Sequence, residues 1–489
     1  MVVPDHKAVT SSLSVVRELT DALETEVVAY CHWKSNAFLD RSRTGENDLD
    51  LLVSRSDAAA FSSIVHGLGF KRATHPVHSL PAIEDYYGLD RASDRLVHVH
   101  AHYQLIVGDD LTKNYRIPLE AAFLQTTVLD GEFRIPIPEL ELILLVIRLT
   151  LKHSTWAAFL LRRAKVPASA GEELAFLRAR VDAGLLEALL KRHLPFVDQE
   201  AFQAAMGSLD LRTTARIRAS RQLVAQLAVC ARRSRPVDLS SKFWRRLEGT
   251  ARARLPLAAP RKHLAGGGAL IAVVGADGAG KSTCVDGLVA WLGQDFVVAK
   301  VHLGRPPRSG LTLFVRPFLK LVLGIAALAR RSSIRVSAQP SPRSRARAVH
   351  AVLTARDRYL AYRRARRLAG GGTLVICDRF PLPQLELMDA PQVDRYMPAS
   401  TGGWLGPRLS ALELRYYRAI FPADVLVVLR VDPETAVGRK PDEEPDFVRA
   451  RWREIWEVDW DTVPAEIVDA GRPAPAVLSE VKALVWSEL

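Results

Sequence analysis

The chain has 489 residues and a formal net charge of +13 at pH 7, and its length excludes a single hydrophobic core because cores stop growing at roughly 250 to 300 residues. Its composition, 48% hydrophobic and 25% charged, is that of soluble globular proteins and excludes wholesale disorder. The four cysteines lie far apart and outside any CxxC or Cys/His cluster, so they suggest neither a disulfide framework nor a zinc site. The amino terminus lacks the unbroken apolar stretch of a secretory signal, so we expect a cytoplasmic protein.

The first part of the chain is expected to form a small α+β domain over residues 1–137. Short β-rich runs alternate there with helical stretches, and the runs lie at residues 27–30, 49–53 and 96–100. From Pro138 onward the apolar residues recur every three or four positions, which predicts a helical extension over residues 138–234. Its helices are predicted at residues 139–165, 171–193 and 199–233. Residues 235–268 are rich in Pro, Arg and Gly and are interpreted as a linker.

Two acids, Asp48 and Asp50, lie in the strand-like run TGENDLDLLV, residues 44–53. Residues two apart on a strand point to the same face, so both carboxylates can hold the same metal ion. The run resembles the DxD element of nucleotidyltransferases. The resemblance implies that the two acids hold Mg²⁺ against a nucleoside triphosphate and that Gly45 frees the backbone for phosphate contact. Two solvated acids on a surface strand would explain the same run.

The third acid of that family has no counterpart in this sequence. The run HVHAHYQL, residues 98–105, stands where relatives often supply it. His100 or His102 would have to replace it, whereas Mg²⁺ prefers carboxylate ligands. His98, His100 and His102 also share one strand face, so they could ligate a transition metal or line a cleft as polar residues.

A phosphate-binding loop is predicted at residues 275–283. The apolar run ALIAVV leads directly into GADGAGKST, and a helix with apolar residues at three- and four-residue spacing follows. Glycines let backbone amides turn toward phosphate oxygens, and the start of the helix adds its dipole. Lys281 is expected to reach the β- and γ-phosphates, and Ser282 to offer its hydroxyl to Mg²⁺. The expected ATP-binding residues are Gly275, Ala276, Asp277, Gly278, Ala279, Gly280, Lys281, Ser282 and Thr283.

Two further apolar runs follow the loop. TLVIC, residues 373–377, ends at Asp378 and Arg379, and an acid at the carboxyl end of a parallel strand is well placed for the magnesium ion. DVLVVLRV, residues 424–431, leads into a second polar segment. Alternating strands and helices predict an α/β domain over residues 269–489, with a mostly parallel sheet and helices on both faces.

Residues 269 to about 470 resemble the thymidylate kinase branch of P-loop nucleoside monophosphate kinases. The matching motifs are GADGAGKST, the CDRF that ends at Phe380, and the VDPETAVGRK that ends at Lys440. The resemblance implies an ATP- and Mg²⁺-dependent phosphotransferase in which Asp378 and Arg379 lie beside the acceptor phosphate. Surface salt bridges are the alternative role for Arg379, as they are for Arg439.

The same resemblance extends to a lid and to the interior of the loop. It implies that Arg439 and Lys440 begin a mobile lid over ATP, and that Asp277 fills the family's acidic position. The segment PLPQLELMDAPQVD after CDRF lacks the serine and the Ala-Tyr-Gln-like element that seat thymine in thymidylate kinases. The acceptor is therefore left open as a nucleotide or another small phosphorylated or hydroxyl compound.

Residues 300–367 contain seventeen Lys and Arg residues but one acid, Asp357. Such a segment attracts phosphorylated substrates, anionic lipid or nucleic acid, although it also fits a solvated helical face. The alternative to an enzyme is therefore a nucleotide-regulated protein whose basic segment binds an anionic partner. The apolar residues 311–329 are interrupted by two basic residues and a proline, so we expect a buried or interfacial helix there and no membrane span.

Overall fold

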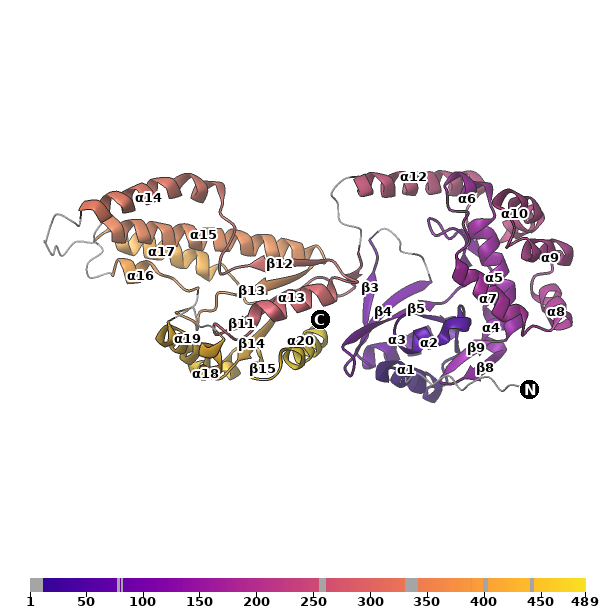
Figure 1. The fold of residues 1–489 in the computed structure, drawn as a ribbon, viewed down its shortest axis with the longest axis horizontal. Coiled ribbons are helices and arrows are strands. Elements are labelled where there is room, and N and C mark those ends of the chain that lie inside the picture. Colours follow the sequence, from indigo (N-terminus) through magenta and orange to yellow (C-terminus); the bar gives the residue numbers. More distant parts are fainter. Residues whose placement is uncertain are drawn as a thin grey trace. The chain divides into compact units, whose positions relative to one another are not determined.

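The structure is a computed structural model that describes residues 12–76, 80, 82–254, 261–329, 342–387, 389–398, 403–439 and 444–489. The chain divides into two compact units, Met1–Pro260 and Arg261–Leu489 (Figure 1). Each unit has its own sheet and its own hydrophobic core.

The first unit contains a mixed sheet with the strand order β1-β2-β5-β4-β3. The bounds are β1 (Tyr30–His32), β2 (Leu49–Val53), β3 (Lys71–Thr74), β4 (Ile83–Asp90) and β5 (Arg95–His102). β2 and β5 are parallel, and the other pairs are antiparallel. The first predicted strand, 27–30, is displaced toward its carboxyl end, because Val27 has a left-handed backbone with φ 53° and an exposed side chain.

Side chains alternate between the two faces of this sheet. Val97, Val99 and Ala101 of β5 pack on one face against helices α1 (Ser14–Thr25) and α3 (Ala58–Gly67). The intervening histidines of β5 therefore lie on the opposite face. The same unit also contains α2 (Leu39–Arg43), β6 (Ile106–Val107), β7 (Tyr115–Arg116), α4 (Glu120–Gln125), β8 (Thr127–Asp130) and β9 (Phe133–Pro136).

The helical part of the first unit has more and shorter helices than the periodicity predicts. They are α5 (Pro138–His153), α6 (Trp156–Leu160), α7 (Ala168–Arg178), α8 (Ala183–His193), α9 (Gln199–Gly207), α10 (Thr213–Ala219) and α11 (Arg221–Gln226). New N-caps interrupt the predicted long helices, since Thr155 accepts from Ala158 N and Asp182 accepts from Leu185 N. The predicted linker is wrong over its first twenty residues, which form α12 (Arg235–Arg254). Pro236 lies in the first turn of that helix, where an N–H would have no acceptor within the helix, so its absence costs no helical hydrogen bond.

The second unit contains a parallel sheet with the order β12-β13-β11-β14-β15. The bounds are β11 (Leu270–Gly275), β12 (Val298–His302), β13 (Leu374–Asp378), β14 (Val425–Arg430) and β15 (Glu466–Asp469). Helix α15 (Pro342–Gly370) packs against one face through the side of β11 that carries Leu270, Ala272 and Val274. Helices α13 (Lys281–Leu292) and α20 (Ala474–Glu488) contact each other and the other side. The predicted α/β sheet with helices on both faces is confirmed.

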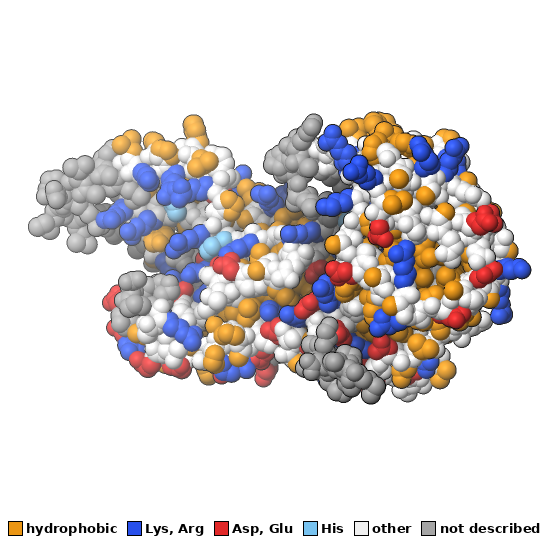
Figure 2. Space-filling view, turned by 45° about the vertical axis from the view of Figure 1, so that its right-hand side comes forward, with side chains coloured by type: hydrophobic (Ala, Val, Ile, Leu, Met, Phe, Trp, Pro, Cys, Tyr) orange, Lys and Arg blue, Asp and Glu red, His pale blue; other side chains and the backbone are white. Residues whose placement is uncertain are grey.

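The described residues of the second unit form five further helices: α14 (Gly310–Ala329), α16 (Val393–Tyr396), α17 (Leu405–Arg418), α18 (Pro433–Gly438) and α19 (Pro445–Glu457). α14 runs beside α15 (Figure 1). The expectation for 311–329 is a buried or interfacial helix; Leu313, Phe314 and Phe318 are exposed, which excludes the buried alternative for these residues and leaves the interfacial one. Figure 2 shows Lys and Arg side chains gathered on the part of the second unit that contains α14 and α15. No helix in the described ranges has the length and apolarity that crossing a membrane requires.

Candidate functional site

A strand-loop-helix segment forms the predicted phosphate-binding loop. β11 ends at Gly275 and α13 begins at Lys281. Gly278 and Gly280 have φ 85° and 82°, a left-handed backbone that glycine adopts readily. A Cβ on Gly278 would also lie 2.6 Å from the carbonyl oxygen of Ala436. The loop therefore turns sharply and packs closely against α18, as a backbone cradle for phosphates requires.

The ammonium of Lys281 lies inside the loop. It donates to the carbonyl oxygens of Gly275 at 2.9 Å and Ala276 at 2.7 Å, and the residue is only 6% exposed. Burial lowers the pKa of Lys281 to about 8, although the carboxylate of Asp277 at 3.7 Å partly offsets this effect. In this conformation the lysine neutralises the loop's own carbonyl dipoles.

Ser282 and Asp378 meet at the carboxyl edge of the parallel sheet. Asp378 is the last residue of β13 and faces Val273 of β11 in register. The Ser282 hydroxyl donates to Asp378 Oδ2 at 3.2 Å. A hydroxyl and a carboxylate are oxygen donors of the kind that Mg²⁺ prefers, so this pair fits the predicted magnesium site.

Asp277 is a buried acid surrounded by cations. It is 3% exposed, and its carboxylate accepts from Arg379 Nη2 at 2.8 Å and from Arg451 Nη1. Burial by itself would raise the pKa of Asp277, but the charges of Lys281, Arg379 and Arg451 outweigh it and hold the pKa below its usual value. Arg379 has a left-handed backbone with φ 62°, a conformation that costs a non-glycine residue free energy.

Arg439 lies against the outside of the loop. Its Nη1 donates to the carbonyl oxygens of Gly278 at 3.4 Å and Ala470 at 3.1 Å. α18, which precedes it, is capped by Asp432 through the N–H of Thr435 at 2.9 Å. Lys440, the second predicted lid residue, lies outside the described residues.

A cavity of about 610 Å³ opens between α15, α16, α17 and α19. Its charged and aromatic lining includes Arg347, His350, Arg358, Asp389, Arg395, Tyr396, Glu413, Tyr417 and Arg451. Burial raises the pKa of Glu413, whose carboxylate accepts from the N–H groups of Gln392 and Val393. Four arginines and two acids line the cavity, which makes it attractive to anions.

Arg358 belongs to the basic segment but is buried at 3% exposure. It donates to the carbonyl oxygens of Leu303 and Asp389, both at 2.8 Å, and pairs with the Asp389 carboxylate at 2.9 Å. Asp389 in turn lies 3.9 Å from Arg379 Nη1. Part of the positive charge in residues 300–367 thus builds the cavity wall and is not a solvated face.

In the first unit the two acids that were predicted to hold one metal ion have different partners. Asp48 precedes β2 and pairs with His98 Nδ1 at 2.8 Å. Asp50 is buried and pairs through Oδ1 with Lys34 Nζ at 2.7 Å and His100 Nδ1 at 3.2 Å. A possible metal-binding group in the described part of the chain contains Asp50, His100 and His102. The structure therefore does not place Asp48 in that group.

Burial sets the charge state of this cluster. It lowers the pKa of His102 to about 3 and also lowers the pKa of His100. The pKa of Asp50 is held well below its usual value: burial opposes this shift, but Lys34, His100 and His102 outweigh it. The cluster therefore combines an ionised carboxylate with two neutral imidazoles at neutral pH.

The comparisons with known proteins place the chain among bacterial relatives. No protein-family model matches it. It is 28% identical over 221 residues to the uncharacterized ATP-binding protein YghR of Escherichia coli K12, covering 44% of this chain and 86% of YghR. It is 30% identical over 218 residues to the uncharacterized ATP-binding protein YghS of the same strain, covering 43% of this chain and 89% of YghS. The chain belongs to the YghS family.

Two solved structures are similar to this YghS-family chain over less than half of its length. One is a thymidylate kinase from Candida albicans, with 18% identity, a TM-score of 0.30, and coverage of 45% of this chain and 91% of that chain. The other is a deoxyadenosine kinase from M. mycoides with bound dATP, with 14% identity, a TM-score of 0.28, and coverage of 44% and 98%. The fold assignment rests on the sheet order and the loop geometry described above.

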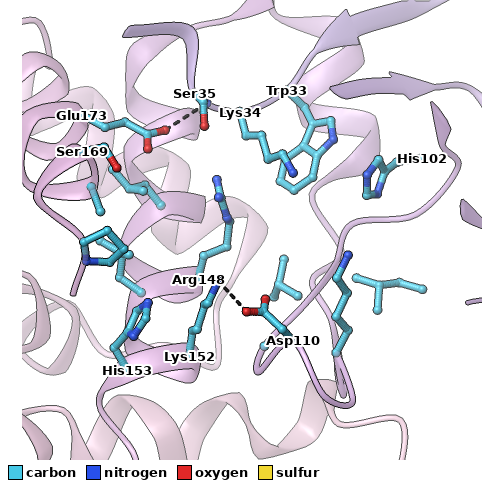
Figure 3. A pocket seen from close by; sticks show the side chains of 18 residues that line it. Trp33, Lys34, Ser35, His102, Asp110, Arg148, Lys152, His153, Ser169 and Glu173 are labelled. Atoms are coloured by element: carbon cyan, nitrogen blue, oxygen red, sulfur yellow. Dashed lines mark hydrogen bonds and ion pairs between the residues drawn. The ribbon is translucent and has the colours of Figure 1, made fainter. Parts of the chain in front are cut away.

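The first unit of this YghS-family protein contains a basic cavity of about 260 Å³ (Figure 3). Its cationic side chains are those of Lys34, Lys113, Arg148 and Lys152. Trp33 lies at the top of the view in Figure 3, and the Lys34 ammonium and the Arg148 guanidinium are 5.0 and 5.3 Å from its ring. Two of these cations are paired with carboxylates, Lys152 with Asp110 at 2.9 Å and Lys34 with Asp50 at 2.7 Å. The charges of Lys113 and Arg148 favour an anionic ligand.

Sequence reasoning missed four side chains of these sites: Asp85, Arg358, Asp389 and Arg451. Asp85 lies opposite His100 across β4 and β5. An acid therefore lies near the histidines, but on β4 and not on β5, where the third acid was expected. Arg451 lies 174 residues beyond Asp277 on α19. No local motif of the YghS-family sequence marks any of the four.

Proposed function

We propose that the second unit is an ATP- and Mg²⁺-dependent phosphotransferase that acts on a small anionic acceptor. One observation carries the proposal: the buried carboxylate of Asp277 inside the loop holds Arg451, which also lines the cationic cavity. Arg379 joins the same carboxylate to Asp389 of the cavity wall. A donor phosphate in the loop and an anion in the cavity would thus share the same two arginines. The printed names of the relatives YghR and YghS, both ATP-binding proteins, support ATP as the donor.

Different groups of the loop would bind different parts of the donor nucleotide. Backbone N–H groups would bind phosphate oxygens, and the Lys281 ammonium would leave the carbonyls of Gly275 and Ala276 for the β- and γ-phosphates. Ser282 and Asp378 would hold Mg²⁺, which neutralises phosphate charge when bound.

The two shared arginines would stabilise the charge of the transferring group. Arg379 and Arg451 are already oriented by Asp277, so they need little reorganisation during transfer. The bond between the γ-phosphorus and the β–γ bridging oxygen breaks, an acceptor oxygen forms the new bond to phosphorus, and ADP leaves. Arg439 would close over the donor from α18.

The chemistry of the cavity defines the acceptor class. Arg347 and Arg395 join Arg358 and Arg451 around it, and Tyr396 and Tyr417 supply aromatic surface. This lining suits a phosphorylated compound with a flat or apolar part. The missing thymine-seating element after Phe380 argues that thymidine monophosphate is a poor acceptor.

The test is substrate-stimulated ADP release by the full-length chain with nucleoside monophosphates, nucleosides and phosphosugars. A phosphorylated compound should stimulate release, and Lys281→Ala should reduce the stimulated rate about 10²-fold or more. Asp286→Asn, on the exposed side of the same helix, is the matched control and should retain the rate. Undiminished stimulation in Lys281→Ala would overturn the proposal, and an efficiency above about 10⁴ M⁻¹s⁻¹ with thymidine monophosphate would overturn the acceptor argument.

For the first unit we propose a nucleotidyltransferase-like module that holds a nucleotide by its phosphates. The basic cavity of Figure 3 and the neighbouring carboxylate of Asp50 support this proposal. Calorimetry on the full-length chain should then give two nucleotide equivalents, and Arg148→Ala should leave one. Arg178→Ala, on a neighbouring helix outside the cavity, should leave both. A single equivalent in the wild type refutes this module.

A further inference from the structure

Three donor atoms converge on one face of the first unit's sheet. β2 and β5 are parallel, with Asp50 facing His100 in register. Asp50 Oδ1 lies 3.2 Å from His100 Nδ1 and 3.7 Å from His102 Nε2, and the two imidazole nitrogens are 3.3 Å apart. The face that bears them is opposite to the face that packs on α1 and α3. The arrangement is thus set by strand register and alternation.

These separations match the coordination shell of a small metal ion. Zn²⁺ binds imidazole nitrogen and carboxylate oxygen at about 2.0 to 2.2 Å, and two ligands of a tetrahedral ion at that distance lie roughly 3.3 to 3.6 Å apart. The three measured separations span 3.2 to 3.7 Å. An ion can therefore enter with only small side-chain movements.

The donor set selects the kind of ion. Two of the three donors are imidazole nitrogens, which suit zinc, cobalt, nickel, copper and iron, whereas Mg²⁺ takes oxygen ligands.

The surroundings of the two imidazoles also fit metal ligation. Asp85 faces His100 across β4 and β5; its Oδ1 pairs with His98 Nε2 at 2.7 Å and lies 4.0 Å from His100 Nε2, beyond hydrogen-bond distance. The negative charge of Asp85 beside the cluster favours a cation there.

Lys34 provides the balancing charge. Its ammonium lies 2.7 Å from Asp50 Oδ1, where it neutralises the carboxylate. Lys34 also lines the cavity of Figure 3, as does His102. An ion bound to Asp50 would take over the neutralisation and leave the ammonium to an anion in that cavity.

We propose that Asp50, His100 and His102 form a binding site for one divalent transition-metal ion of the zinc type. Three protein ligands leave at least one coordination position open, as in catalytic rather than structural zinc sites. His102 lines the cavity of Figure 3 and His100 lines a second hollow, so the open position can take water or an anionic ligand. The site does not depend on phosphoryl transfer in the second unit.

The test is titration of the metal-free, nucleotide-free full-length chain with Co²⁺, followed by visible ligand-field absorption. One equivalent should saturate the signal, Zn²⁺ should abolish it, and excess Mg²⁺ should not. His100→Ala should weaken binding at least about tenfold. His66→Ala, an exposed histidine on α3 of the same unit, is the matched control and should bind like the wild type.

The buried His102→Ala serves as a second variant only if its far-ultraviolet circular dichroism matches that of the wild type. The measurements on His100→Ala and the X-ray absorption of the zinc-loaded wild type stand whether or not His102→Ala folds. The absorption spectrum should contain two imidazole ligands. The proposal is overturned by a wild type that binds no Co²⁺, by unchanged affinity in His100→Ala, by displacement with Mg²⁺, or by a zinc spectrum without imidazole.

Discussion

The buried ammonium of Lys281 makes nucleotide binding depend on pH in a specific way. Burial lowers its pKa from 10.5 to about 8 in the nucleotide-free protein, which disfavours the charged form by roughly 3 kcal/mol. The unfolded chain keeps this proton up to its ordinary pKa. The nucleotide-free fold should therefore gain stability from this group as pH rises from about 8 to 10.5, because the unfolded state then binds more protons than the folded state.

Phosphates in the loop should reverse the shift. An anion beside the ammonium favours the charged form, so ATP binding should raise the pKa of Lys281 and take up a proton. At pH 8 the free protein is about half deprotonated at this site, and the uptake should be about 0.5 proton per ATP; at pH 7 it should fall to about 0.1. Above pH 8 the affinity for MgATP should fall up to about tenfold per pH unit.

Titration calorimetry in buffers of different ionisation enthalpy measures this uptake directly. Lys281→Arg is the control, because an arginine retains the positive charge and does not titrate in this range. The wild type should show a buffer-dependent enthalpy at pH 8, and Lys281→Arg should not. Equal enthalpies in all buffers for the wild type would refute the reasoning, as would the same uptake in the arginine variant.

Two further predictions concern buried acids. Asp277→Asn removes the counterion of two arginines and should lower the free energy of unfolding by about 3 to 5 kcal/mol. The control Asp286→Asn, which breaks an exposed pair with Lys300, should change the free energy of unfolding by less than about 1 kcal/mol. Equal urea midpoints for the two variants would contradict this prediction. Burial raises the pKa of Glu141 to about 7, and the hydrogen bonds from Asn36 offset only part of that rise. The folded state then retains a proton that the unfolded state releases, so this group's contribution to stability is lost between about pH 4.5 and 7, by roughly 3 kcal/mol. The difference in unfolding free energy between wild type and Glu141→Gln should change with pH across that window, and a constant difference would show that the carboxyl group is not protonated.

Local sequence determined the strand-loop-helix of the second unit. Glycines, Lys281 and Ser282 stand at fixed spacing between an apolar run and an amphipathic helix, and each requirement acts over a few residues. The acid at the end of β13 was also predictable, because parallel strands end at the same edge of a sheet. Periodicity was less reliable in the helical part of the first unit, since Thr155 and Asp182 start new helices within the predicted ones.

Tertiary structure decided which side chains meet at each site. The sequence predicted that Lys281 reaches the phosphates of a nucleotide, and the folded loop buries its ammonium against the loop's own carbonyls. Arg451 reaches Asp277 only because α19 packs beside the loop. In the first unit, the register of β2 with β5 pairs Asp50 with His100 and leaves Asp48 to His98. Pairing across strands and helix packing depend on the whole core, so no motif in the sequence could specify these contacts.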